Sequence, residues 1–186
     1  VRLIQTTNNM LSVIYTAATT CYNPGSPIDK ALEAKVMSNA NKLKLIEKCI
    51  KSGHHSVLEH AVFTFAIEGI SRACSHQLVR HRHCSFSQQS QRYVSMADGF
   101  SCVIPKSIAK HETTQDIFDN AMIQLKAAYL ELINSGVKPE DARSILPNAC
   151  CTNIVITLNL RELIHICNER LCTKAQSEIR TLVHKM

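Results

Sequence analysis

The sequence has 186 residues, 45% of them hydrophobic, which suits one globular domain spanning residues 1–186 with a core of its own. Lysine and arginine number 21 against 15 acidic residues, a net charge of +6 that favours anionic ligands without the Lys-rich runs typical of a dedicated nucleic-acid-binding protein. We find no apolar run long enough to span a bilayer and no signal peptide, and nine cysteines without a Cys-x-x-Cys motif predict reduced thiols in the cytoplasm.

The first third of the chain predicts one strand followed by helices. A strand over residues 3–7 leads into a short helix that ends near residue 22. Ser26-Pro27 is a helix start, and apolar residues recur at helical spacing as far as Ile50, which predicts one continuous helix ended by Gly53. The segment His54–His60 holds three histidines and an acid without the spacing of a zinc-binding helix, so we expect a ligand-contacting loop and no metal.

The middle of the chain predicts a strand over 61–67 that Gly69 breaks, and then a helix over 70–82. The polar residues from Arg80 to Tyr93 are expected to form a loop, and 101–104 a short strand. Thr113 or Thr114 is placed to cap a long helix that runs to Asn134.

The last third begins with a short helix opened by Pro139, which carries Arg143. Alternating residues predict a strand over 151–158, and Asn159 starts the next helix. Thr173 is expected to cap the last helix. The fold class that follows is α+β, with a mixed or antiparallel sheet packed against long helices and neither a Rossmann glycine turn nor a Walker loop. The first residue is Val and the last lies in a helical pattern, so we expect the natural chain to be longer at both ends.

The segment Arg80–Tyr93 carries the strongest chemical signal. It contains three arginines, two histidines and three serines, and no acid. Unpaired guanidinium groups are costly to bury, and the planar guanidinium fits phosphate oxygens two at a time. The segment therefore predicts an anion site, most readily a phosphate site. Cations at the end of a helix also suit the helix dipole, so a solvated cap on a helical scaffold remains an alternative.

A protein nucleophile is not evident. Cys84 and Ser90 lie in the basic segment, where nearby cations would favour a thiolate, but there is no Gly-x-Ser-x-Gly elbow and no Ser-x-x-Lys motif. Candidates for proton transfer are His54, His81 and His165. The pattern indicates arginine-assisted electrophilic activation, with any redox step left to a cofactor.

The run Arg80-His81-Arg82, seven residues, then Ser90 with Arg92-Tyr93 behind it resembles the signature of flavin-dependent thymidylate synthases. Three further blocks match in the same order: Gly53–His60, Arg143–Pro147, and Asn159 through Arg170 to Gln176. The resemblance implies conversion of dUMP to dTMP without an enzyme nucleophile. It also implies methylenetetrahydrofolate as the carbon donor, FAD reduced by NADPH, and a non-Rossmann flavin site at the subunit interfaces of a homotetramer.

The same resemblance implies roles for individual residues. Arg170 would be the catalytic residue, contacting the pyrimidine and favouring its ionised form, and His54 would lie near the flavin and the folate. The dUMP site would comprise Gln77, Leu78, Val79, Arg80, Gln88, Gln89, Ser90, Gln91, Arg92, Arg143 and Arg170. The FAD site would comprise Ser56, Arg80, His81, Arg82, Gln88, Asn159, Leu160, Arg161 and His165.

Two positions depart from the family pattern. Gln88 stands where many members have Glu, and Gln91 stands where relatives often have a small residue. A nucleic-acid-binding module is the other reading of the basic segment. Aromatic residues make up only 5% of the chain and Trp is absent, so a base-stacking platform is hard to assemble and neither a nucleic acid nor a membrane is expected as a partner.

Overall fold

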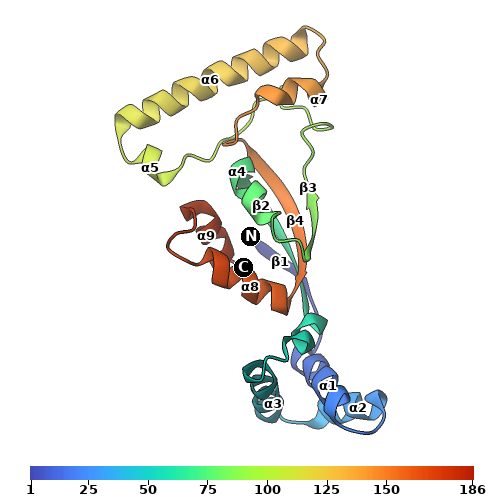
Figure 1. Ribbon diagram of the computed structural model, residues 1–186. Helices are drawn as coiled ribbons and strands as arrows, with labels where there is room; N and C mark the ends of the chain where they lie inside the picture. Colours follow the sequence, from blue (N-terminus) through green and yellow to red (C-terminus); the bar gives the residue numbers. More distant parts are fainter.

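The computed structural model describes residues 1–186, which form an elongated molecule with a sheet in its middle (Figure 1). The strands are β1 (Arg2–Thr6), β2 (Val62–Ser71), β3 (Cys84–Gln88) and β4 (Cys151–Asn159). The α-helices are α1 (Met10–Tyr22), α2 (Pro27–Val36), α3 (Asn39–Lys51), α4 (Arg72–Leu78), α5 (Lys106–Ala109), α6 (Glu112–Asn134), α7 (Pro139–Ala142), α8 (Leu160–Arg170) and α9 (Ser177–His184). Two 3₁₀ helices complete the fold, η1 (His55–His60) and η2 (Arg143–Ile145).

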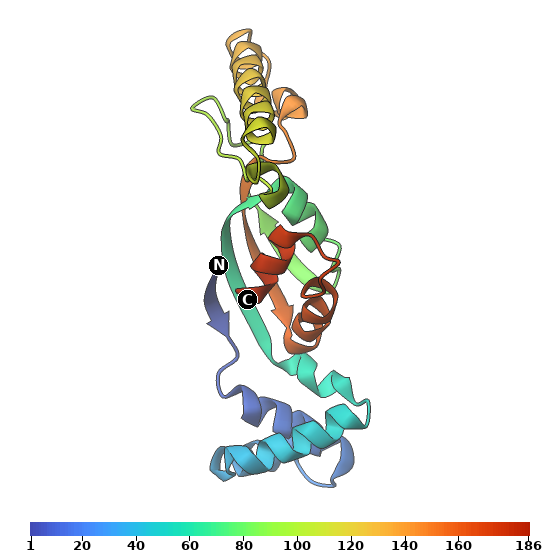
Figure 2. The same ribbon diagram turned by 90° about the vertical axis from the view of Figure 1, so that its left-hand side faces the viewer.

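The sheet has four strands in the order β1-β2-β4-β3, and every neighbouring pair is antiparallel, which confirms the α+β class. Helices α4, α8 and α9 lie on one face of it (Figure 2). Alternate residues of β2 and β4, such as Phe65, Ile67 and Ile156, pack with Leu78 and Ile166 of these helices in the main core. We call this part the central unit (β1–β4, α4, α8 and α9).

A smaller core lies at one end of the molecule, where α1, α3 and η1 meet around Ile14, Ile46 and Leu58. The prediction of one continuous helix from Pro27 to Ile50 is wrong. The chain leaves the helical conformation at Met37, and the Ser38 hydroxyl accepts the amide of Asn41 to start α3 afresh. The expected loop at 54–60 is the 3₁₀ helix η1.

Gly69 does not break the second strand. It sits at a β-bulge, where β2 shifts register between Ile67 and Ile70, and its φ of 68° is in the left-handed region that glycine tolerates. The strand continues to Ser71, whose hydroxyl accepts the amide of Cys74 and so begins α4. The predicted helix over 70–82 is therefore confined to Arg72–Leu78.

The expected loop from Arg80 to Tyr93 contains the edge strand β3, which pairs with β4 from Cys84 opposite Leu158 to Gln88 opposite Ile154. Cys84 and Phe86 are half-buried against the main core, whereas Ser85 and Ser87 are exposed. This alternation was the missed signal, because polar residues on the open face hid a strand whose other face is apolar.

Residues 103–149 form an arm at the opposite end of the molecule (Figure 1). The predicted strand over 101–104 is only an isolated backbone β-bridge between Cys102 and Cys150. Two backbone hydrogen bonds flank it, from Cys151 N to Ser101 O (2.8 Å) and from Val103 N to Ala149 O (2.9 Å). The long helix is confirmed as α6, but the threonines do not cap it: the Thr114 hydroxyl donates to the carbonyls of Ile108 and His111.

Helix α6 buries only Tyr129 fully, and Ile117 and Ile123 are 66% and 64% exposed. The last helix begins at Ser177 with Gln176 as its N-cap residue, so Thr173 is not the cap. No helix in the molecule is both long enough and apolar enough to cross a membrane.

Candidate active site

Arg170, at the C-terminal end of α8, is fixed by two contacts. Its Nε donates to Nε2 of His81 at 2.9 Å, and its Nη2 donates to the carbonyl of Gln77 at 3.4 Å. A guanidinium carries five N–H donors, so about three remain free for a ligand. The structure thus brings together Gln77, His81 and Arg170, which were all predicted to lie in the site. Arg170 is about ninety positions away from the other two in the sequence.

His81 is buried, with 6% of its surface exposed, and lies between Arg170 and the carboxylate of Glu162. Burial lowers the pKa of His81 below its usual 6.5, and the positive charge of Arg170 lowers it further. The ring is therefore neutral near pH 7. Its edge also faces the ring of His165 at a centroid distance of 5.8 Å.

The start of α8 forms a polar pocket of about 490 Å³, which we call the α8 pocket. The Asn159 side chain caps the helix by accepting the amide of Glu162 at 2.9 Å, and Arg161 reaches Glu59 of η1 at 2.6 Å. All six residues of the lining are polar: Glu59, His83, Asn159, Arg161, Glu162 and His165. Three of the predicted flavin residues therefore meet here.

The other end of the basic segment lies against the arm. Arg92 Nε donates to a carboxylate oxygen of Glu140 at 2.6 Å, and Arg143 Nε donates to the backbone carbonyl of the same residue at 3.1 Å. Ser90 Oγ accepts the amide of Arg92 at 3.2 Å. The two arginines, both predicted to lie in the dUMP site, therefore gather around one acidic residue at the base of the arm, and Ser90 lies next to Arg92.

The two departures from the family pattern are accommodated within the chain. Gln88 donates to the hydroxyls of Ser75 (2.9 Å) and Thr152 (3.2 Å), while the buried Gln91 donates to the sulfur of Cys150 at 3.6 Å. A glutamate at position 88 could make at most one of these donations, and only when protonated, whereas an ionised carboxylate could only accept from the two hydroxyls.

The remaining predicted residues are spread more widely. The side chain of Leu78 is fully buried in the main core, and Gln89 pairs with Asn153 of β4 through both backbone and side chain. Val79 is 37% exposed, Leu160 is half-buried against the smaller core, and Arg80 and Arg82 are exposed in the turn after α4. Ser56 and His54 lie beyond the central unit, His54 with its ring against Tyr22.

The arm end and the α8 end of this set lie at opposite ends of β4. Cys150, which contacts Gln91, precedes the first residue of β4, and Asn159 is the last. Nine residues of extended strand span about 27 Å. One copy of the chain therefore does not bring Arg92 and Arg143 together with Asn159 and Arg161, while Gln77, Arg170 and His81 lie between them on α4, α8 and the turn after α4.

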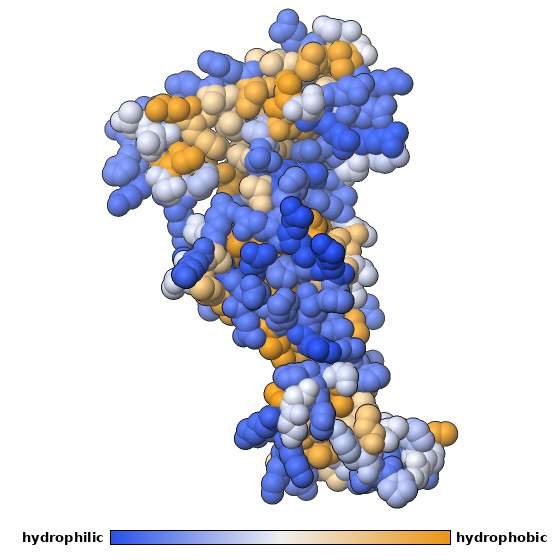
Figure 3. Space-filling view, viewed as in Figure 1, coloured by the Kyte–Doolittle hydropathy of each residue, from blue (hydrophilic) through white to orange (hydrophobic).

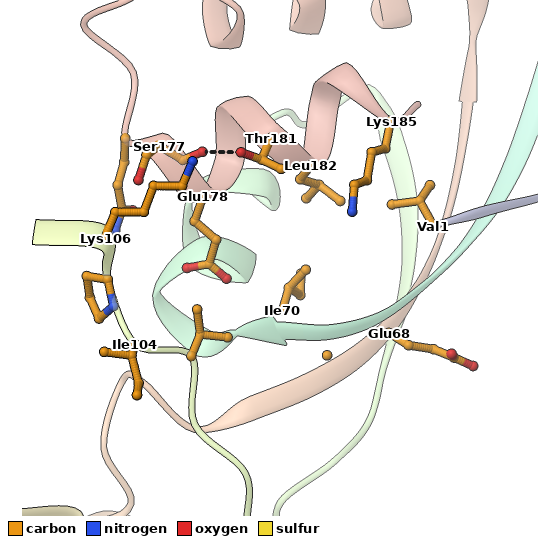
Figure 4. A pocket seen from close by; sticks show the side chains of 14 residues that line it. Val1, Glu68, Ile70, Ile104, Lys106, Ser177, Glu178, Thr181, Leu182 and Lys185 are labelled. Atoms are coloured by element: carbon orange, nitrogen blue, oxygen red, sulfur yellow. Dashed lines mark hydrogen bonds between the residues drawn. The ribbon is translucent and has the colours of Figure 1, made fainter. Parts of the chain in front are cut away.

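Another pocket, of about 280 Å³, opens between β2, α9 and residues 103–106 (Figure 4). None of the predicted site residues lines it. One of its two carboxylates, Glu178, already accepts the amide of Ser71 at 2.7 Å and the Ser71 hydroxyl at 2.6 Å, which ties α9 to the start of α4. Hydrophilic residues instead cover most of the central unit on the face seen in Figure 3.

Comparison with known proteins identifies the family. The model of the thymidylate synthase complementing protein family matches residues 2–186. The chain belongs to this family. It is similar to proteins named flavin-dependent thymidylate synthase from Geobacter sulfurreducens (47% identity), Clostridium tetani (42%) and Nitratidesulfovibrio vulgaris (40%). Each similarity covers all of this chain and 79%, 80% and 80% of the relative, respectively.

Three residues that line the α8 pocket of this family member are absent from the predicted site: Glu59, His83 and Glu162. Glu162 is only 7% exposed. The signal that could have found it is its position three residues after Asn159, which puts an acid in the first turn of a helix, where the dipole favours it.

The expectation that cations would favour a thiolate at Cys84 is wrong in this family member. Burial raises the pKa of Cys84 to about 12, and the negative charge of Glu162 adds to the effect. At pH 8 about one thiol in ten thousand would be ionised. The half-buried thiol packs against the core of the sheet.

Replacement of Cys84 should accordingly leave catalysis intact. We expect Cys84→Ser to keep turnover within about threefold of the unmodified protein, because no thiolate is available to lose. Iodoacetamide at pH 8, followed by mass spectrometry, should label the exposed Cys172 well before Cys84. A dead Cys84→Ser variant that retains its fold, or labelling of Cys84 first, would restore a thiol mechanism.

Proposed function

We propose that this chain catalyses the reductive methylation of dUMP to dTMP, with methylenetetrahydrofolate as carbon donor and NADPH as reductant. The observation that carries the proposal is Arg170, held by His81 and Gln77 beside the Arg-His-Arg motif with N–H donors to spare. The names of the relatives, flavin-dependent thymidylate synthases, support the same reaction. Residues 1–186 would act as one catalytic domain.

The α8 pocket is the proposed site for FAD, which when bound supplies the hydride that completes the methyl group. The pocket fits a polar, anionic cofactor: it opens at the N-terminus of an eleven-residue helix and is lined by Arg161, Asn159 and His165. Arg161 would exchange Glu59 for a phosphate oxygen. The exchange costs little because the pair is exposed, with relative accessibilities of 55% and 44%. Ser56, Arg80, His81, Arg82, Gln88 and Leu160 complete the proposed set, and His54 would lie near flavin and folate.

The proposed role of Arg170 is to stabilise negative charge on the pyrimidine, since its positive charge is held in place before the reaction begins. Arg80, Arg92 and Arg143 would bind the phosphate, and Ser90 would orient the nucleotide, with Gln77, Leu78, Val79, Gln88, Gln89 and Gln91 around it. No side chain is assigned as a nucleophile, which agrees with the protonated state of Cys84.

We further propose that each active site is assembled from more than one copy of the chain, in a homotetramer. Two observations support this. Reaction requires contact between flavin and pyrimidine, yet Arg143 and Arg161 lie at opposite ends of the sheet. Apolar residues also stay exposed where a partner could cover them, including Leu3, Ile4 and Ile117.

The visible absorption spectrum tests the proposal. The purified protein should show flavin bands, alone or after addition of FAD. These bands should bleach with NADPH under anaerobic conditions and return only when dUMP and methylenetetrahydrofolate are both present. A protein that neither contains nor takes up FAD would overturn the proposed function.

A further inference from the structure

We infer that Glu162 is a positioning residue for the proposed reaction: it holds the ring of His81 in one tautomer, and His81 in turn aims Arg170. The inference rests on the proposed function, because that function gives Arg170 its task. Nothing in the sequence motif assigns a role to Glu162, and its position at the start of α8, rather than beside Arg170, kept it out of the predicted site.

The tautomer of His81 follows from its partner. Arginine stays protonated and its Nε can only donate, so Nε2 of His81 must present a lone pair to it at 2.9 Å. The proton of the neutral ring is then on Nδ1. The nearest acidic atom to that nitrogen is Oε1 of Glu162, at 3.7 Å. A carboxylate there stabilises a proton on Nδ1 and disfavours the tautomer that would turn an N–H against Arg170.

Burial strengthens the preference of His81 for one tautomer. His81 and Glu162 are 6% and 7% exposed, so water competes little with the contact and the charge of the carboxylate is weakly screened. Glu162 is itself held at the first turn of α8, where its amide bonds to the side chain of Asn159. Its carboxylate therefore acts on the ring from a fixed position.

The ring links the two ends of α8. Glu162 and Arg170 are eight residues apart, about 12 Å along a helix, and the ring of His81 lies between their side chains. Arg170 extends back along the helix to meet the ring, and its Nη2 also reaches the carbonyl of Gln77 on α4. Loss of the carboxylate would release the ring, and the guanidinium would lose one of its two anchors.

The cluster also resembles a metal site, because His81, Glu162 and His165 offer ligand atoms within 4.8 Å of one another. A cation would need a lone pair of His81, and the only one available already accepts from Arg170. The geometry therefore favours a hydrogen bond that orients Arg170 over a bound metal ion.

Three substitutions of Glu162 test the inference, with Glu169→Leu as a matched control. Glu169 lies on the same helix, is exposed and makes no side-chain hydrogen bond to His81, and its charge acts on the ring more weakly than that of Glu162. Glu162→Leu removes the carboxylate at similar volume, Glu162→Gln keeps an oxygen near Nδ1 but removes the charge, and Glu162→Asp keeps the charge but withdraws it by one methylene. Turnover, the KM for dUMP, flavin content and thermal unfolding are measured for each.

We expect the turnover number of Glu162→Leu to fall about 10- to 100-fold, as for other residues that orient a functional side chain. Turnover of Glu162→Gln should fall about tenfold because the charge is lost, whereas Glu162→Asp and Glu169→Leu should stay within about threefold. Flavin content and the KM for dUMP should change far less than turnover in Glu162→Gln, which keeps the size and polarity of the side chain that lines the α8 pocket.

Two outcomes would overturn the inference while leaving the proposed function intact. One is normal turnover in Glu162→Leu and Glu162→Gln. The other is a parallel loss of flavin, stability and activity in all three variants, which a purely structural role would produce. If Glu162→Leu fails to fold, the comparison of Asp with Gln decides, and equal turnover in the two counts against positioning. An unmodified protein without dUMP-dependent flavin oxidation would instead remove the proposed function.

Discussion

Arg170→Ala should lower the rate of dUMP methylation by about 10²- to 10³-fold, the usual loss when a preorganised group facing developing charge is removed. Flavin should remain bound, because the polar pocket at the start of α8 does not include Arg170. Steady-state turnover together with the flavin absorbance per chain checks both parts. If loss of flavin accounts for the entire defect, Arg170 is a cofactor residue and its assignment to the pyrimidine is wrong.

Two companion variants sharpen that result. Arg170→Lys keeps the charge but loses the Nε–H donated to His81 and the planar fork, so it should remain severely impaired. Arg2→Ala removes an exposed arginine from the first residue of β1 and should behave like the unmodified protein. Normal activity in Arg170→Lys would mean that charge alone suffices and that the contact with His81 has no part in catalysis.

Two inactive variants should restore activity to each other if active sites are shared between copies. Arg143 lies at the base of the arm and Arg161 lies at the start of α8, at opposite ends of the sheet. When Arg143→Ala and Arg161→Ala chains are unfolded and refolded together, random mixing leaves about one quarter of two-chain sites with both arginines intact. Turnover should then recover to about a quarter of the value for the unmodified protein.

The control for this experiment mixes Arg143→Ala with Arg92→Ala. Both arginines contact Glu140, so they belong to the same end of one chain. Every site in this mixture should therefore lack one of the two arginines. That mixture should remain near the activity of its parents. Equal recovery in both mixtures, or none in either, would count against sites built from complementary ends of different chains.

The sequence predicts the helices and strands whose local residue pattern is distinctive. The strand before Asn159, the helix that Asn159 caps, and the long helix ending at Asn134 were all expected from periodicity and capping residues, and all are present. The glycine at 69 was misread because a bulge and a strand end look alike in sequence. Only the pairing of β2 with β4 shows that the ladder resumes at Ile70.

The sequence predicts a set of candidate site residues but not how they are arranged. The motif resemblance named Arg170 and His81 separately, and no spacing rule relates positions 89 residues apart. Their contact exists because α4 and α8 pack on the same face of the sheet. The role of β4 in separating Arg143 from Arg161 likewise depends on strand order, which is a property of the folded chain.

The isolated backbone β-bridge between Cys102 and Cys150 closes the arm at its base, so that the arm is a modular insertion. The chain leaves the central unit at Ser101 and returns at Cys151, and these two residues are hydrogen-bonded to each other. Lengthening or shortening the segment between them alters a closed excursion of 47 residues, 103–149, without shifting the register of β4 against β2 or β3. The arm can therefore vary in reach and surface while the geometry around Arg170 stays fixed.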